Sequence, residues 1–255
     1  MTEANHPILI PMPATTPNSS PPVPPATRPA ALALFDLDGT LIPGDSDHAF
    51  GEFMVQLGWV DAAAHRQAND AFFLQYQAGT LDIDAYIDFT TSAWRQRPLA
   101  EQAAASQRFI AEVMRPQLLP PALALLRQHQ QAGDLVAIVT ATNDFITRPI
   151  AAALGVEHLL AVQLERGADG RATGLIDGVP TFREGKITRV QQWLAGLGYG
   201  ATNPLADFET SVFYSDSTND LPLLEQVRTP VATNPSPALE AIALQRGWRI
   251  LRLFP

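Results

Sequence analysis

The chain of 255 residues contains no cysteine, which excludes disulfide bonds, thiolate metal sites and a cysteine nucleophile. Basic residues are also few, because 17 lysines and arginines stand against 26 aspartates and glutamates, for a net charge of −9. A nucleic-acid partner requires a basic surface, so this balance argues against one. The five histidines show no HxH or HxxxH spacing, which argues against a histidine-rich zinc site.

Long apolar runs are missing as well. None approaches the ~20 residues that a helix needs to cross a bilayer, and the first residues lack the basic start and continuous apolar segment of a secretory signal. We therefore expect a cytoplasmic protein without a membrane partner. Nine of the 22 prolines fall within residues 1–29 among small polar residues, and we expect this segment to be a disordered tail. The folded part would then begin near Ala30.

Two aspartates follow the first apolar run of the chain, in the string FDLDGTL at residues 35–41. The preceding residues 31–34 are all apolar, which is typical of a strand covered on both faces. Alternate residues of a strand share a face, so Asp36 and Asp38 can address one site. Crowded carboxylates repel unless a cation or a shared proton is present, and a divalent metal is the natural partner. A strand that ends in an Asx-stabilised turn explains the motif equally well on its own.

The following seventy or so residues have helical periodicity. Four helices are expected: one that carries Phe50 and Phe53, one between Asp61 and Gly79, one that begins at Asp82, and one whose apolar stripe ends at residue 114. Four helices in succession directly after the first strand predict an inserted helical cap at residues 43–116, over the carboxyl end of that strand. Helices that pack directly on the sheet are the alternative.

Strands and helices alternate after residues 120–121. Strands are expected at residues 135–140, 159–162, 211–215, 230–232 and near Trp248, with helices between them. The polar stretch 164–181 is expected to form a hairpin. This alternation predicts an α/β fold, a doubly wound parallel sheet formed by residues 30–42 and 117–255. In such a sheet the active crevice lies at the carboxyl ends of the strands.

Further polar residues fall at those strand ends. Thr140 ends one strand, where its hydroxyl and the following backbone N–H groups can hold a phosphoryl oxygen or simply cap a helix. Lys186 opens a helix, where a cation opposes the helix dipole, so this locally unfavourable residue indicates a function unless it is a surface lysine. Asp216 ends an apolar strand and suits a metal, while Asn219 and Asp220 begin the next helix, where structural caps are also expected.

These four groups of residues, in this order, resemble the four signatures of the haloacid dehalogenase superfamily. The string at residues 35–41 is similar to its first signature, and the DxxND pattern at residues 216–220 is similar to its fourth. The resemblance covers roughly residues 31–251. It points to the branch that includes phosphoserine phosphatase, which has a Rossmann-like core and a helical cap at this insertion point.

The resemblance implies a Mg²⁺-dependent phosphatase that acts on a small phosphate ester. Asp36 would attack phosphorus to form an aspartyl-phosphate, and Asp38 would protonate the leaving alkoxide and then deprotonate the hydrolytic water. Mg²⁺ would be held by the Asp36 carboxylate, the Asp38 backbone carbonyl and Asp216.

The same resemblance assigns the remaining polar residues to the phosphate. Thr140, Lys186 and Asn219 would neutralise the phosphate oxygens, where the charge resides. Asp220 would orient Lys186 or a metal-bound water.

The cap departs from the phosphoserine phosphatases. Their carboxylate-binding arginine falls near Asp88, and an acidic lining from Asp45, Asp47 and Asp88 would repel a substrate carboxylate and attract a cation. The strings GDSDH at residues 44–48 and NDAF at residues 69–72 resemble a subgroup that includes histidinol-phosphate phosphatases. Histidinol phosphate carries an ammonium, an imidazole and no carboxylate. Asp45 and Asp47 would, in the simpler interpretation, only cap the first cap helix.

Histidinol phosphate is therefore the favoured substrate, and alternatives stay open. One is hydrolysis of phosphoserine or of another small phosphorylated metabolite. A phosphotransferase on the same scaffold would keep both aspartates of the first motif. A binding module that holds phosphate without turnover is a more remote possibility. The sequence does not indicate an oligomeric state.

Overall fold

The computed structural model describes residue 1, residues 29–200 and residues 202–254. The predicted disordered tail lies outside the described residues, apart from its two end positions. Among the described residues, no helix is both long and apolar enough to cross a membrane.

A parallel sheet of six strands forms the core, in the order β3-β2-β1-β6-β7-β8. Central strand β1 pairs with β2 and β6, so that Phe35 at its end lies between Ile138 and Tyr214. The strands are β1 Ala31–Phe35, β2 Leu135–Asn143, β3 His158–Val162, β6 Thr210–Ser215, β7 Thr229–Thr233 and β8 Arg249–Leu251. This architecture confirms the predicted doubly wound α/β fold.

Helices cover both faces of the sheet because neighbouring strand residues point to opposite sides. Phe35 and Ile138 pack in one apolar cluster with helices α5 and α6, whereas Leu34 and Val139 pack in a second with α7, α8 and α9. These helices are α5 Pro120–Ala132, α6 Asp144–Leu154, α7 Glu184–Gly196, α8 Leu221–Leu224 and α9 Pro237–Arg246. The sheet is therefore buried on both faces, which explains the apolar run of β1 and the apolar first half of β2.

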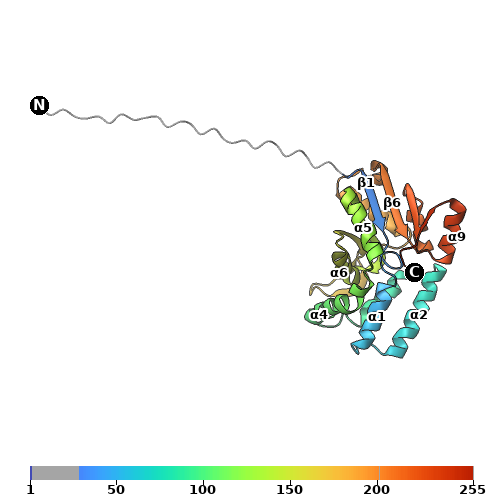
Figure 1. Cartoon of the computed structure of the whole chain (residues 1–255). Coiled ribbons are helices and arrows are strands. Elements are labelled where there is room, and N and C mark those ends of the chain that lie inside the picture. The colour runs from blue at the N-terminus through green and yellow to red at the C-terminus, as the bar shows by residue number, and fades with distance from the viewer. Residues whose placement is uncertain (2–28, 201, 255) are drawn as a thin grey trace.

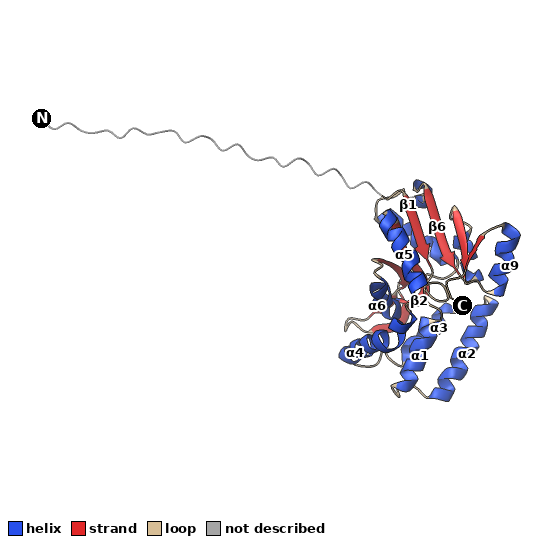
Figure 2. Cartoon of the chain, viewed as in Figure 1, coloured by secondary structure: helices blue, strands red, loops and turns tan. Residues whose placement is uncertain are grey.

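Four helices follow β1, as the periodicity predicted. They are α1 Ser46–Gln56, α2 Ala62–Ala78, α3 Ile83–Ser92 and α4 Leu99–Phe109, and α4 continues into a π-helical turn at Ile110–Met114 and a 3₁₀ turn at Arg115–Gln117. Asp61 caps the start of α2 and Gly79 ends it in the left-handed conformation. Figures 1 and 2 show α1 and α2 beyond the end of the sheet toward which β1 and β6 point. The exact limits of the cap, residues 43–116, stay a prediction.

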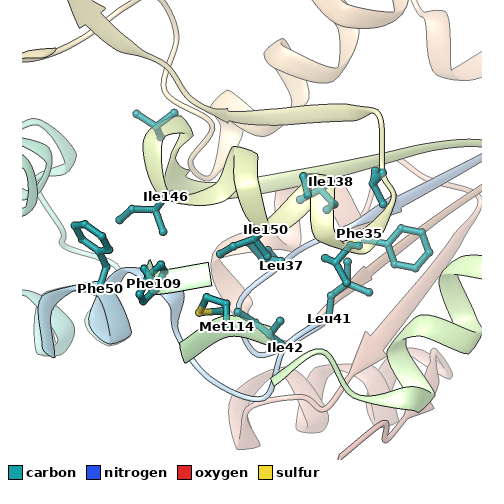
Figure 3. Packing of buried hydrophobic residues seen from close by; sticks show 14 of the residues in the cluster. Phe35, Leu37, Leu41, Ile42, Phe50, Phe109, Met114, Ile138, Ile146 and Ile150 are labelled. Carbon is teal, nitrogen blue, oxygen red and sulfur yellow. The ribbon is translucent and has the colours of Figure 1, made fainter. Parts of the chain in front are cut away.

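Three of these helices, α1, α3 and α4, share one apolar cluster with the α/β core. Phe50 of α1 and Phe109 of α4 contact the cluster that contains Ile146 and Ile150 of α6 (Figure 3). The rings of Phe50 and Phe109 meet edge to face with centroids 5.0 Å apart. This shared packing fixes the base of the helical segment on the core.

A hairpin completes the fold, and one strand and one helix differ in their limits from the prediction. Strands β4 Leu164–Arg166 and β5 Ala172–Ile176 form the predicted antiparallel hairpin. Strand β2 continues three residues beyond the predicted end, since Asn143 still pairs with Val162. The helix expected from Asn219 begins as a 3₁₀ turn at Thr218–Asp220, and the α-helical part is only the four residues of α8.

Candidate active site

A cavity of about 360 Å³ lies between the carboxyl ends of the strands and the helices that follow β1. It brings together most of the polar residues that the sequence singled out, although they are far apart in the chain. Its lining from the core consists of Asp36, Asp38, Thr140, Ala141, Thr142, Phe182, Lys186, Asn219 and Asp220. From the helical segment it consists of Asp45, His48, Asn69, Asp70, Phe72, Phe73, Tyr76, Leu81, Ile83 and Tyr86.

Lys186 lies on the floor of the cavity between two carboxylates. Its Nζ donates hydrogen bonds to Asp36 Oδ1 at 2.9 Å and to Asp220 Oδ2 at 2.8 Å, and its side chain is only 3% exposed. Burial lowers the pKa of Lys186, but the carboxylates of Asp220 and Asp36 outweigh that effect and hold the pKa above its ordinary value. Ser215 Oγ donates to Asp220 at 2.7 Å. Asp220 therefore fixes a lysine that stays positively charged.

Asp36 extends β1 by one residue, and its backbone N–H donates to the Tyr214 carbonyl at 2.9 Å. Burial raises the pKa of its carboxyl well above the usual range, Lys186 lowers it, and Asp220, Asp216 and Asp38 raise it again. One lysine is thus not enough to balance the negative charge gathered around Asp36.

Asp38 is held by donors from two directions. Its Oδ1 accepts from the Ser46 backbone N–H at 2.6 Å, and its Oδ2 accepts from Thr142 Oγ1 at 2.9 Å and from Thr140 Oγ1 at 3.5 Å. Burial and the nearby Asp45 raise the pKa of Asp38 to about 6, against the opposing effect of the hydrogen bonds from Ser46 and Thr142. A carboxyl group with a pKa near neutrality can both give and take a proton.

Thr142 was not singled out by the sequence, although a signal for it was available. It stands two residues after Thr140 in the extended end of β2, so both hydroxyls lie on the same face of the strand. The structure shows both of them at Asp38.

Asp216 follows β6 and packs against the turn after Asp38. A Cβ atom on Gly39 would lie 2.4 Å from Asp216 Oδ2, and Gly39 has a φ of +71°, so both contact and conformation require glycine. Thr40 Oγ1 lies 3.4 Å from Asp216 Oδ1. Burial and the nearby Asp220 raise the pKa of Asp216 to about 7.

The chemistry of these oxygens fits the predicted magnesium site. Among the described residues, no three acidic or histidine side chains gather as a metal cluster. The predicted Mg²⁺ ligands are only two carboxylates, those of Asp36 and Asp216, together with the backbone carbonyl of Asp38. Both carboxylates have raised pKa values, because burial and neighbouring acids disfavour their charge. Hard oxygen donors with unbalanced negative charge are what a divalent cation prefers.

The carboxyl end of α2 reaches across to the core at the edge of the cavity. Asn219 Nδ2 donates to the Tyr76 carbonyl at 3.2 Å, and Tyr76 Oη donates to Ser217 Oγ at 3.2 Å. Arg183 Nη1 donates to the Gly79 carbonyl at 2.8 Å, and Arg183 adopts a φ of +50°, which is strained for a residue other than glycine. Three hydrogen bonds thus join the end of this helix to the segments that carry Lys186 and Asn219.

The three acidic residues predicted for the cap occupy different environments. Asp45 lines the cavity and also caps α1, since its carboxylate accepts from the backbone N–H groups of Asp47 and His48, both at 2.9 Å. Asp47 is buried behind the lining, where burial and the nearby Asp45 raise its pKa well above the usual range and the Tyr86 hydroxyl faces it.

Asp88 does not line the cavity, contrary to the expectation. Its carboxylate forms an ion pair with Arg95 at 2.6 Å, beside Gly174 of the hairpin. The reason is helical geometry: Ile83 and Tyr86 of α3 face the cavity, and Asp88 is two positions beyond Tyr86, which places it on the opposite side of the helix.

Comparisons with known proteins agree with this geometry. A model of the family described as haloacid dehalogenase-like hydrolase matches residues 33–225. The histidinol-phosphatase of Neisseria meningitidis serogroup C (strain 8013) is 43% identical over 220 residues, which cover 86% of this chain and 97% of that protein.

Solved structures give the same result for the fold. A protein of unknown function from Bordetella pertussis Tohama I has a TM-score of 0.82 at 47% identity, with 89% of this chain and 100% of that chain covered. A substrate-bound phosphoserine phosphatase has a TM-score of 0.61 at 17% identity, with 88% of this chain and 93% of that chain covered, which is a likeness of fold alone.

The match over residues 33–225 and the 43% identity confirm the resemblance on which the sequence predictions depended. The prediction that this chain is a phosphatase agrees with the family match and with the related histidinol-phosphatase. The chain belongs to the haloacid dehalogenase-like hydrolase family.

Proposed function

We propose that this enzyme is a Mg²⁺-dependent phosphomonoester hydrolase that acts on histidinol phosphate through an aspartyl-phosphate intermediate. The observation that carries the proposal is the charge distribution of the cavity. Among the described residues that line it, Lys186 is the only lysine or arginine, and it lies on the core side beside Asp36. The opposite wall carries Asp45 and Asp70. Such a cavity suits a substrate with a phosphate at one end and a cationic group at the other.

The proposed reaction uses the carboxylates in two steps. A carboxylate oxygen of Asp36 attacks phosphorus, the bond to the ester oxygen breaks, and Asp38 gives its proton to the leaving alkoxide. Asp38 then takes a proton from water, and the water oxygen attacks phosphorus to release phosphate and restore Asp36. The pKa of Asp38 at about 6 supports both roles, since acid and base forms are accessible near neutral pH.

The other residues of the floor would hold the phosphate. Lys186 and Asn219 line the cavity from the segments that begin α7 and α8, and Thr140 lines it from β2. We assign all three to the phosphate oxygens, where negative charge is concentrated during transfer. Mg²⁺, bound by Asp36, Asp216 and the Asp38 carbonyl, would supply further positive charge to those oxygens.

The choice of histidinol phosphate over phosphoserine is supported by two observations. The related Neisseria protein, at 43% identity, is a histidinol-phosphatase. A phosphoserine carboxylate would need a cationic partner in the cap, and Arg95 is instead paired with Asp88 outside the cavity lining. Asp45 and Asp70 would repel a carboxylate in that position.

The test is phosphate release from L-histidinol phosphate and from L-phosphoserine at matched concentrations, with Mg²⁺ and with EDTA. We expect turnover that requires Mg²⁺ and favours histidinol phosphate by at least about tenfold in kcat/KM. Asp36→Asn should abolish turnover while the protein stays folded. Faster hydrolysis of phosphoserine would overturn the substrate assignment, and near-normal activity of Asp36→Asn would overturn the mechanism.

A further inference from the structure

The cap wall of the cavity carries a histidine whose ring is held by a buried amide. His48 lies in the first turn of α1, and Asn69 lies in α2 with only 7% of its surface exposed. Both line the cavity, and Asn69 Nδ2 lies 2.5 Å from His48 Nδ1. With the amide in this orientation Asn69 Nδ2 donates and His48 Nδ1 accepts, which in the neutral ring leaves the proton on Nε2. Asn69 therefore selects the tautomer in which Nε2 of His48 is a donor.

Aromatic and acidic side chains line the same cavity as His48. Phe72 and Tyr86 meet edge to face with ring centroids 5.4 Å apart, and both line the cavity. Flat apolar walls of this kind suit an aromatic ring. Asp45 caps the helix whose first turn carries His48, and Asp70 follows Asn69 directly, so the same wall of the cavity carries two carboxylates. The cap wall thus combines a ring surface, a hydrogen-bond donor and negative charge.

We infer that His48 determines specificity by donating a hydrogen bond from Nε2 to the acceptor nitrogen of an imidazole ring carried by the substrate. Asn69 is the positioning residue, which acts through His48. This inference rests on the proposed function and extends it by naming the contact that recognises the imidazole ring of the substrate. A neutral imidazole has one acceptor nitrogen, whereas a hydrocarbon ring has none and would leave the donor unpaired.

The experiment compares two substrates that share the amino-alkyl phosphate and differ in the ring. L-Histidinol phosphate has the imidazole, and L-phenylalaninol phosphate has a phenyl ring without an acceptor. The ratio of their kcat/KM values measures recognition of the imidazole nitrogen. In the wild-type enzyme we expect this ratio to favour histidinol phosphate by at least about tenfold.

His48→Phe keeps a ring but removes the donor, so it should lower the ratio by about tenfold, through KM for histidinol phosphate rather than through kcat. His48→Gln places an amide N–H near the position of Nε2 and should recover part of the ratio. The matched control is His158→Phe, because His158 packs against Trp193, outside the cavity lining, and this variant should keep the wild-type ratio.

Asn69→Leu tests the positioning role separately. This variant should let the His48 ring exchange between its two tautomers, which would change the ¹⁵N chemical shifts of the ring. It should also lower the ratio of kcat/KM values for the two substrates without lowering kcat. An unchanged ratio in His48→Phe, in an enzyme that prefers histidinol phosphate to phosphoserine, would overturn the inference and leave the proposed function standing. A wild-type enzyme that prefers phosphoserine would overturn both.

Discussion

Replacing Gly39 by alanine should separate the cost of backbone strain from the cost of displacing Asp216. Gly39 has a φ of +71°, and an added Cβ would lie 2.4 Å from Asp216 Oδ2, where ordinary contact begins at 3.4 Å. The carboxylate must therefore retreat by about 1 Å. Left-handed backbone costs an alanine roughly 1–2 kcal/mol. A displacement of about 1 Å in a catalytic group can cost about 100-fold in rate.

Gly58→Ala is the matched control. Gly58 has a φ of +68° with no atom within 4 Å of the added Cβ, so this variant has the strain without the collision. Urea denaturation should show Gly58→Ala destabilised by roughly 1–2 kcal/mol and Gly39→Ala by at least as much, because it adds the collision to the strain. Phosphate release at saturating Mg²⁺ should fall about 100-fold for Gly39→Ala alone. Equal activity in the two variants would refute the assignment of Asp216 to the metal.

Three further predictions address other contacts of the site. Thr142→Val removes the hydroxyl that donates to Asp38 at 2.9 Å, and kcat/KM in the phosphate-release assay should fall about tenfold or more because hydrogen bonds to charged groups contribute about 1.5–3 kcal/mol. Arg183→Gly removes the hydrogen bond to the Gly79 carbonyl and relieves the φ of +50°, so steady-state kinetics should show KM raised about two- to tenfold while thermal stability is kept. Without Mg²⁺ the free energy of unfolding should fall as the pH rises from about 4 to about 7. In the folded state Asp38 and Asp216 keep their protons up to pKa values of about 6 and about 7, whereas in the unfolded chain they lose them near 3.8. Thermal melts should therefore show a larger stabilisation by Mg²⁺ at about pH 8 than at about pH 5, and equal stabilisation would contradict the charge argument.

The elements of the fold could be predicted because their signals are local. Strand β1 is an apolar run and β6 has an apolar centre, and Asp61, Gly79 and Asp82 mark helix ends by capping chemistry that depends on adjacent backbone groups. The convergence of Asp36 and Asp220 also followed from sequence, since parallel strands place their carboxyl ends at one edge, whereas Lys186, in α7 after the hairpin, was expected there from the family resemblance.

The orientation of cap residues was harder to predict. Asp88 was expected in the cavity, and its place on the opposite side of α3 depends on which face of that helix packs inward. Two apolar faces compete on this helix, because Tyr86 faces the cavity while Ile87 is fully buried. Periodicity alone does not decide between them.

The contacts that close the cavity have no local signal at all. Tyr76 and Ser217 are 141 residues apart in the chain, and Arg183 and Gly79 are 104 apart. Their hydrogen bonds exist only after the helical segment has packed on the core. Asp36 and Asp38, to which we assign the reaction, sit in one short motif because the end of β1 places them, whereas the residues that line the cavity from the helical segment are placed by packing between two segments. It follows that, in this chain, short motifs indicate the proposed site of reaction more readily than they indicate the residues that would contact the substrate.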